Sequence, residues 1–454
     1  MKKIISMLLA AVMLFSASIP AFAAESDYTI VSPYKDVVWG VTNEYKGNLH
    51  THSTYSDAQA TLTETILEHY EQGFDFIAMT DHGVTGVAWN QKPYRRLLYS
   101  YQPIIGKKQD CFTDEEYQAL LSGNYALKST GKARGNGMTC VTGGNELNAL
   151  TASKSHVNGY FLPEDYGNTN LGYENELGFE YAVKQVDEVG GLSHINHPGD
   201  WLDSNDDINN VYDEESLNFF AELFLKYDSC LGMEVFNEKN SVTPYDRILW
   251  DNLLMKTLPY GRNIIGFSNN DTHERETVDS SFSVFMMKNN TVADIKETMQ
   301  SGTFFMITRR IKENNVIGPD EYIDVMDKQL PYPMFTNLSV NGHKVVVNAR
   351  NSDYVQWIAN GKVIYKQNIV SPLQPVVLDL DKIEGNEDFL YIRAELYGEG
   401  GLCASQALTI DNGSADAEYE EDTSFDAIWT KIVRFFTSLR IYVYIEELIK
   451  EITG

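Results

Sequence analysis

Apolar, strand-like segments of this chain repeatedly end in histidine, aspartate or glutamate, and this pattern most constrains the fold. Between Gly47 and Asp57, His50 and His52 stand at alternate positions, and the apolar run Phe74 to Thr80 leads into His82. If residues 49–52 end a strand, the two imidazoles point to one face. Polar surface explains a single pair of this kind equally well. Its repetition predicts an α/β barrel, because parallel strands deliver the side chains at their carboxyl ends to one mouth.

Segments with helical periodicity separate the strand-like runs. In the first, Leu62, Ile66 and Tyr70 share one side and Gly73 ends the pattern, while His69 is expected to face solvent or a neighbouring turn. The long irregular stretch 84–137 is expected to be a lid or substrate wall. This organisation predicts a barrel over residues 24–330. The expected helices span residues 61–72, 114–121, 178–189, 214–226, 245–255 and 292–300.

The polar residues at the predicted strand ends form one set. A buried structural histidine explains one or two of them in isolation. It does not explain a whole set placed where parallel strands deliver their side chains to one mouth. The set comprises His50, His52, Asp57, His82, Glu146, His156, His197, Asp271 and His273, with His194 nearby.

This set resembles the polymerase and histidinol phosphatase (PHP) family of metallohydrolases, and the match covers roughly residues 45–302. The resemblance implies a distorted (β/α)7 barrel with three metal ions at the carboxyl ends of its strands. The motifs in the family's order are His50-x-His52 with Asp57, Thr80-Asp81-His82, Glu146 with His156, Asn196-His197-Pro198 and Asp271-x-His273. The resemblance also implies His50, His52, Glu146 and Asp271 as ligands of one metal, Glu146, His156 and His197 of a second, and Asp57, His82 and His273 of a third.

Catalytic roles are expected for Glu146, Asp57, His82 and His194. Glu146, as the bridging ligand, would hold the metals at the required separation, and Asp57 with His82, or His194, would assist protonation of the leaving group. His197 fits the His-Pro motif, so His194 is expected to orient a ligand or face the substrate, unless it is a core histidine. Glu234 is expected to orient a ligand, unless it is a buried carboxylate with a purely structural role.

The ligand types indicate the chemistry. Imidazole and carboxylate suit Zn, Mn or Fe and do not choose among them. Nine ligands without cysteine differ from a closed structural zinc site and leave positions for water and substrate. A bridging water with its pKa lowered towards ~7 becomes a hydroxide nucleophile. We therefore expect a metal-dependent phosphoesterase acting on a small phosphomonoester or phosphodiester. A hydrolase of carboxyl or carbamate esters, and a surface binding module without turnover, are the alternatives.

Charge narrows the range of partners. The formal net charge is −28, and such a surface repels nucleic acid and anionic lipid. We therefore expect a small phosphoester as substrate and no nucleic-acid partner. Lys92, Arg95 and Arg96 are candidates for contacting the phosphate, with surface solvation as the alternative.

The amino terminus predicts export. Lys2 and Lys3 precede an apolar run that reaches Ala21-Phe22-Ala23, which is typical of a secretory signal peptide over residues 1–23. The protein is then secreted or held at the cell surface. An uncleaved anchor is the alternative, although the run is shorter than the ~20 apolar residues that span a bilayer. Four cysteines are too few for a disulfide scaffold, and a single disulfide is the alternative to four free thiols.

After the barrel region the pattern changes. Short strand-like runs separated by turn dipeptides such as Asn341-Gly342 and Asn360-Gly361 predict a small Ig-like β-sandwich over residues 335–411. An acidic linker is expected over residues 412–424. Residues 425–454 form an amphipathic, aromatic-rich segment that predicts a helix. Its cations argue against a spanning helix, which leaves docking on a protein surface and contact with a membrane surface as alternatives.

Overall fold

The computed structural model describes most of the chain from Tyr28 onward. The predicted signal peptide, Arg96 and residues 442–454 lie outside the described residues. The described parts are 28–95, 107–148, 154–167, 173–238, 243–313, 321–439 and 441.

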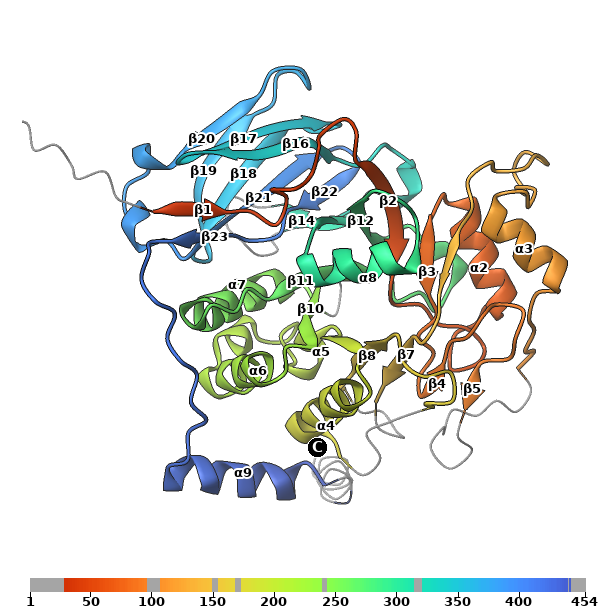
Figure 1. Ribbon diagram of the computed structural model, residues 1–454, viewed down its shortest axis with the longest axis horizontal. Helices are drawn as coiled ribbons and strands as arrows, with labels where there is room; N and C mark the ends of the chain where they lie inside the picture. The colour runs from red at the N-terminus through yellow and green to blue at the C-terminus, as the bar shows by residue number, and fades with distance from the viewer. Residues whose placement is uncertain are drawn as a thin grey trace, which may run out of the picture.

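Within the predicted barrel region the helices begin and end close to the positions that the sequence predicts, whereas the predicted C-terminal helix ends at Thr437. In α2 the Thr61 hydroxyl accepts a hydrogen bond from the Glu64 amide, and the Glu64 carboxylate accepts one from the Thr61 amide. This capping box fixes the start of the helix. α6 and α7 lie side by side (Figure 1). The helices are α2 (Leu62–Glu71), α3 (Asp114–Ser122), α4 (Asn175–Glu188), the short α5 (Pro198–Trp201), α6 (Glu214–Lys226), α7 (Asp246–Thr257), α8 (Val292–Ser301) and α9 (Phe425–Thr437).

The main strands of the predicted barrel region form two sheets. In the first, β2, β3 and β6 run parallel, and β12 and β13 extend the sheet in antiparallel fashion. In the second, β9, β10 and β11 run parallel, whereas β8 lies antiparallel between β7 and β9. The strands are β2 (Asn43–Asn48), β3 (Phe76–Ala78), β6 (Thr139–Val141), β7 (Asn145–Leu147), β8 (Val157–Tyr160), β9 (Leu192–Ile195), β10 (Cys230–Asn237), β11 (Ile265–Asn269), β12 (Ser281–Met287) and β13 (Phe304–Thr308). Two short hairpins, β4 (Val84–Thr85) with β5 (Tyr94–Arg95) and β14 (Arg310–Glu313) with β15 (Glu321–Asp324), form separate two-stranded sheets.

The mixed α/β fold is therefore confirmed, but the main strands of this region form two sheets rather than one closed barrel. The antiparallel strand β8 interrupts the series of parallel strands that a (β/α) barrel would contain. Single bridges join the two sheets at their carboxyl ends. Thr51, after β2, pairs with Thr272, after β11, and His82 pairs with Glu146. The sheets thus meet where the sequence places its set of polar residues.

The C-terminal β region is continuous with the barrel region. Some of its strands belong to the same sheet as β2 and β13, because β22 pairs with β13. Three other strands form a separate sheet. The early strand β1 (Thr29–Val31) also lies in this region, paired with β23 (Figure 1). The strands are β16 (Met334–Asn341), β17 (Lys344–Arg350) and β20 (Val376–Asp379) in the separate sheet, and β18 (Tyr354–Ala359), β19 (Lys362–Asn368), β21 (Tyr391–Gly398), β22 (Gly401–Ala404) and β23 (Leu408–Asp411) in the shared one.

A buried ion network fastens α7 to β21. The Arg393 guanidinium, fully buried, donates to both carboxylate oxygens of Asp251 at 2.8 and 2.7 Å, and to Glu395 at 2.6 Å. Arg247 donates to the second oxygen of Glu395 at 2.9 Å. Because each buried charge has a hydrogen-bonded partner of opposite sign, loss of one member would leave others uncompensated.

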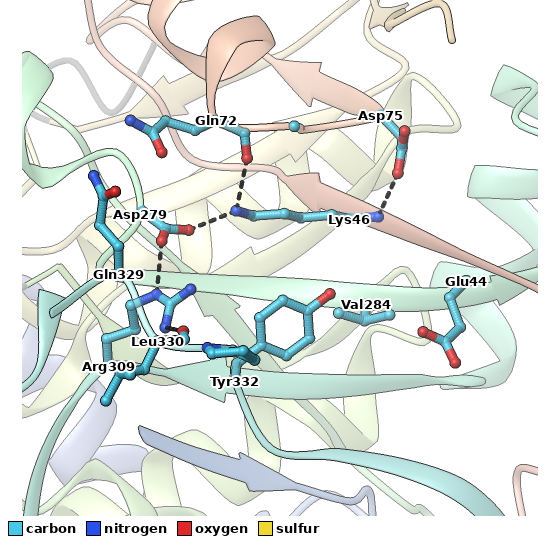
Figure 2. A pocket seen from close by; sticks show the side chains of 12 residues that line it. Glu44, Lys46, Gln72, Asp75, Asp279, Val284, Arg309, Gln329, Leu330 and Tyr332 are labelled. Atoms are coloured by element: carbon cyan, nitrogen blue, oxygen red, sulfur yellow. Dashed lines mark hydrogen bonds and ion pairs between the residues drawn. The ribbon is translucent and has the colours of Figure 1, made fainter. Parts of the chain in front are cut away.

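A pocket of about 450 Å³ lies near the amino end of β2, away from the residues that follow its carboxyl end (Figure 2). Asp279 lies between two cations, 2.5 Å from Lys46 Nζ and 2.7 Å from Arg309 Nε. Lys46 Nζ also lies 4.2 Å from the centres of the Phe74 and Phe282 rings. Asp279 thus pairs with both cations, so these three groups are held by the fold rather than presented to a ligand.

The structure corrects the expected position of His69 and shows the state of the cysteines. His69 does not face solvent: it is buried, its Nδ1 lies 2.8 Å from the carbonyl oxygen of Thr65, and its Nε2 accepts a hydrogen bond from Asn270 at 2.9 Å. The α2 face that carries it packs on the residues after β11. All four cysteines are free. Among the described residues, every helix is too short or too polar to cross a membrane.

Candidate metal centre

All nine predicted ligands lie at or beside the carboxyl ends of strands or at the start of β8. Glu146 is in β7, and the backbone after β9 and β11 turns sharply to aim His197 and Asp271 inward. Both residues have a positive φ, 28° and 43°, a conformation that costs a non-glycine residue about 1–3 kcal/mol and is tolerated where the surroundings enforce it. The ligands come from the segments after β2 (His50, His52, Asp57), after β3 (His82), in β7 (Glu146), before β8 (His156), after β9 (His197) and after β11 (Asp271, His273).

Glu146 lies at the centre of the cluster. Its Oε2 is 2.9 Å from His82 Nδ1, 3.1 Å from His52 Nε2 and 3.3 Å from His50 Nε2. Its Oε1 is 2.9 Å from His156 Nδ1. Five imidazoles approach this carboxylate if His197, at 3.6 Å, is included. Glu146 is therefore placed to contact neighbouring ions.

Asp271 faces Glu146 across the two histidines that follow β2. Its Oδ1 is 3.0 Å from His52 Nε2 and 3.1 Å from His50 Nε2, and its Oδ2 is 3.9 Å from His197 Nε2. His50 Nε2 and His52 Nε2 are 3.1 Å apart. Two imidazole nitrogens at this distance repel each other unless a proton or a cation lies between them.

Asp57 forms the outer edge of the cluster. Its carboxylate is 3.3 Å from His273 Nε2 and 3.5 Å from His82 Nε2. The side chains of Asp57 and His273 are about one third exposed, at 34% and 33%, whereas those of His50 and His52 are fully buried. Solvent therefore reaches the cluster from the side of Asp57 and His273.

The ligand atoms fall into four overlapping groups. His50, His52, His82 and Glu146 each belong to two of them. Asp271 groups with His50 and His197, whereas the family resemblance implies His197 in a different metal site. The groups are His50, His52 and Glu146; His50, His197 and Asp271; His82, Glu146 and His156; and His52, Asp57, His82 and His273.

The donor set fits divalent metal ions. Glu146 Oε2 and Asp271 Oδ1 are buried and have no hydrogen-bond partner, although imidazole nitrogens lie within 3.3 Å of both. An unpaired buried carboxylate oxygen is costly. Two donors that each lie about 2.1 Å from a shared cation stand roughly 3.0–3.4 Å apart, the spacing seen here. Contacts of this length without hydrogen-bond geometry are therefore what metal ligands require.

The charges of the cluster favour cations. Burial raises the pKa of the Glu146 carboxyl, but the nearby His82 and His50 outweigh this effect and hold the pKa well below its ordinary value. Burial lowers the pKa of His197, yet Glu146 and Asp271 raise it to about 9. The carboxylates are thus ionised, and metal binding to such a site releases protons from imidazoles.

Glu234, in β10, supports two of the ligands from behind. Its Oε1 accepts a hydrogen bond from His50 Nδ1 at 2.9 Å, which leaves His50 Nε2 directed at the cluster. Its Oε2 accepts from the His197 backbone amide at 3.1 Å and from Asn237 Nδ2 at 2.8 Å. Glu234 is therefore a buried, hydrogen-bonded carboxylate that contacts two predicted ligands, and its orienting role stays a prediction.

Two asparagines that the sequence reasoning did not single out also contact the ligand carboxylates. Asn196 Nδ2 donates to Glu146 Oε1 at 2.7 Å, and Asn237 Nδ2 lies 3.2 Å from Asp271 Oδ2. Both stand at strand ends, one beside His197 and the other at the end of β10. Their position at strand ends was the available signal, and Asn196 also belongs to the Asn196-His197-Pro198 motif, in which only His197 was given a role.

The prediction that His194 faces substrate is wrong. It lies within β9, fully buried, with its ring stacked on Phe267 at 4.5 Å and its Nε2 2.8 Å from the Tyr160 hydroxyl. The Tyr160 hydroxyl in turn donates to the carbonyl of Leu49. Burial lowers the pKa of His194 to about 4, despite the charge of Glu234. His194 is a neutral core residue beneath the cluster.

Two cations hold the loop that carries Asp57. Lys107 Nζ donates to the carbonyl oxygens of Ser56, Asp57 and Ala58, at 2.8 Å for Asp57. The Arg95 guanidinium donates to the carbonyl of Tyr55, and its Nη1 is buried without a hydrogen-bond partner. Lys92 is exposed. Lys107 was missed because the insertion that contains it shows no periodic pattern.

Comparisons with known proteins find likeness only among solved structures. No protein-family model and no curated protein matches the chain. A two-domain protein from Bacteroides vulgatus containing a predicted PHP-like metal-dependent phosphoesterase is 14% identical, with 82% of this chain and 96% of that chain covered and a TM-score of 0.41.

Two further structures are more distant. The lesion-specific endonuclease PfuEndoQ from Pyrococcus furiosus is 15% identical over 57% of this chain and 56% of that chain, with a TM-score of 0.31. An amidohydrolase from Chromobacterium violaceum is 14% identical over 50% of this chain and 87% of that chain, with a TM-score of 0.26. The structural neighbours thus include a protein with a predicted PHP-like metal-dependent phosphoesterase, an endonuclease and an amidohydrolase.

Proposed function

We propose that this protein is a metal-dependent phosphoesterase that hydrolyses a small phosphomonoester or phosphodiester. The observation that supports the proposal most is a pair of buried carboxylate oxygens, Glu146 Oε2 and Asp271 Oδ1, that face imidazoles without a hydrogen bond. We propose three divalent ions, of Mn, Zn or Fe, held by the nine ligands. Such ions would supply a hydroxide nucleophile and neutralise the charge of the phosphoryl group.

The residues of the chain define how the substrate meets this centre. Glu146 and Asp271, fixed from behind by Asn196 and Asn237, keep the inner ligands in one arrangement. The phosphoester enters at the solvent-facing edge formed by Asp57 and His273, and water reaches the leaving oxygen from the same edge. Leaving-group protonation by Asp57 and His82 stays a prediction.

Arg95 is the basic residue that we propose as a phosphate contact. Its unpartnered Nη1 lies next to the loop that precedes Asp57, and guanidinium groups bind phosphate oxygens through fixed, paired donors. Lys107 already donates hydrogen bonds to three backbone carbonyls, so we propose that it anchors the loop that carries Asp57. We propose secretion or attachment at the cell surface, which the amino-terminal sequence predicts.

The test is hydrolysis of para-nitrophenyl phosphate and its bis ester by the full mature chain loaded with Mn or Zn. We expect activity that falls at least about 10²-fold in His52→Ala and Asp271→Ala, while His343→Ala, a histidine outside the cluster, retains it. Wild-type activity in both ligand variants would overturn the proposal.

Two further measurements distinguish the alternatives. Inhibition by inorganic phosphate or vanadate supports phosphoester chemistry, whereas hydrolysis of carboxyl or carbamate esters without such inhibition supports the other hydrolase. Elemental analysis of the purified protein should find stoichiometric metal that is lost in Asp271→Ala. A wild-type protein that takes up no metal would instead support a binding module without turnover.

A further inference from the structure

Helix α9 is amphipathic, but its apolar face points away from the protein. Phe425 is 78% exposed, Trp429 57% and Phe436 58%. At 100° per residue the exposed apolar side chains cover an arc about 160° wide. The exposed apolar residues are Phe425, Ile428, Trp429, Ile432, Val433, Phe435 and Phe436.

The opposite face of α9, which is polar, contacts the body of the molecule. The Arg434 guanidinium lies 5.2 Å from the centre of the Phe219 ring and 3.9 Å from Glu176. The carbonyl of Ser438, at the end of the helix, accepts a hydrogen bond from the Glu174 amide at 2.9 Å. Figure 1 shows α9 along the outer edge of the molecule, below α4 and α6. A helix docked on its own chain for stability would bury the apolar face instead.

The charged residues near the apolar face of α9 bear on which kind of surface can bind it. The chain has a formal net charge of −28, yet from Ala427 to Tyr444 its sequence contains Lys431, Arg434 and Arg440 and no acidic residue. Within α9, Arg434 faces the body of the molecule, whereas Lys431 borders the apolar face with its side chain 45% exposed and its Nζ 2.7 Å from Glu421. Tryptophan and phenylalanine beside cations are typical of helices that lie in the interface of a lipid bilayer, where apolar rings enter the acyl boundary and cations meet headgroup phosphates.

We propose that α9 is a membrane-surface anchor that lays its exposed aromatic face into the interface of a lipid bilayer. The helix lies in the plane of the membrane rather than across it, because it is short and one face is polar. Its convex, wide apolar arc suits a fluid surface, and the acidic body is held away from the headgroups. The catalytic cluster does not take part in this contact, so anchoring and activity are separable.

The experiment is flotation of the full mature chain with phosphatidylcholine vesicles, whose zero net charge avoids repulsion of the acidic body. We expect the protein to float with the vesicles. The fluorescence of Trp429, the tryptophan of α9, should shift to the blue on binding. Trp429→Ser combined with Phe436→Ser should lower the partition coefficient at least about tenfold, because two large rings no longer leave water.

A matched control uses other exposed apolar residues. Val370 and Leu373, between β19 and β20, are 84% and 91% exposed, and Val370→Ser with Leu373→Ser should leave flotation unchanged. An equal loss in both double variants, or no flotation of the wild type, would overturn the proposal. So would a concentration-dependent dimer that Trp429→Ser dissociates in the absence of vesicle binding, since a second copy would then cover the face. Thermal unfolding of each variant confirms that the rest of the chain is folded.

Discussion

Replacement of Glu234 by glutamine tests whether the metal centre depends on groups that do not touch the metal. Each carboxylate oxygen of Glu234 accepts two hydrogen bonds: Oε1 from His50 and Asn269, and Oε2 from the His197 amide and Asn237. In Glu234→Gln one of these oxygens becomes an NH₂ group that faces two N–H donors. Two hydrogen bonds to a charged acceptor are lost, each of about 1.5–3 kcal/mol.

The loss acts on one of the predicted ligands whichever way the amide turns. If NH₂ replaces Oε1, His50 can keep a partner only by moving its proton from Nδ1 to Nε2, and a protonated Nε2 cannot bind a metal. If NH₂ replaces Oε2, the strained backbone of His197 loses its support. Groups in this position typically change metal affinity 10–100-fold. We therefore expect the affinity of Glu234→Gln for Mn or Zn to fall roughly 10–100-fold.

The assay is competition for the metal with a chromophoric chelator at neutral pH, for the wild type and the variant. Glu188→Gln, on the exposed face of α4 with its side chain 60% exposed, is the matched control and should bind metal like the wild type. A Glu234→Gln protein that folds and binds metal within about twofold of the wild type would refute the reasoning that His50 is oriented from behind.

Two further predictions concern stability. Burial lowers the pKa of His69 to about 4 in the folded protein, below its value in the unfolded chain, so the unfolded state binds more protons between about pH 4 and 6.5. The free energy of unfolding should therefore fall by about 3 kcal/mol as pH drops through this window. Urea titrations of His69→Gln should show a flatter dependence of this free energy on pH. An unchanged dependence would contradict the lowered pKa of His69. Asp251→Ala should lower the free energy of unfolding by about 3–5 kcal/mol, because it leaves the buried Arg393 without its bidentate partner. Asp388→Ala on the surface is the control and should change this free energy by less than about 0.5 kcal/mol. Equal effects of the two substitutions would refute the contribution of the buried ion network to stability.

Local sequence patterns were sufficient for much of the fold and for the ligand set. The helix boundaries followed from periodicity and from capping residues such as Thr61, which act within one turn. The candidate ligands followed from their position after apolar runs, because a strand's carboxyl end is a local property. The structure brings all nine together around Glu146 and Asp271.

Side-chain direction in fully buried elements was beyond the sequence. All four residues of β9 are buried, so alternation cannot tell which of its faces points to the cluster, and His194 was misplaced for this reason. The face of α2 that carries His69 was likewise ambiguous, because His69 packs against Asn270 from a distant segment. Only the packing of both faces decided these positions.

The sequence by itself determined which chemistry the chain can carry, because residue types and strand ends are local. Tertiary structure decided what local patterns cannot express. β1 pairs with β23, two sheets meet through single bridges at the ligands, Glu234 reaches His50 from behind, and α9 turns its apolar face outward. These features depend on contacts between residues far apart in the chain, whose free energy is set by packing and burial.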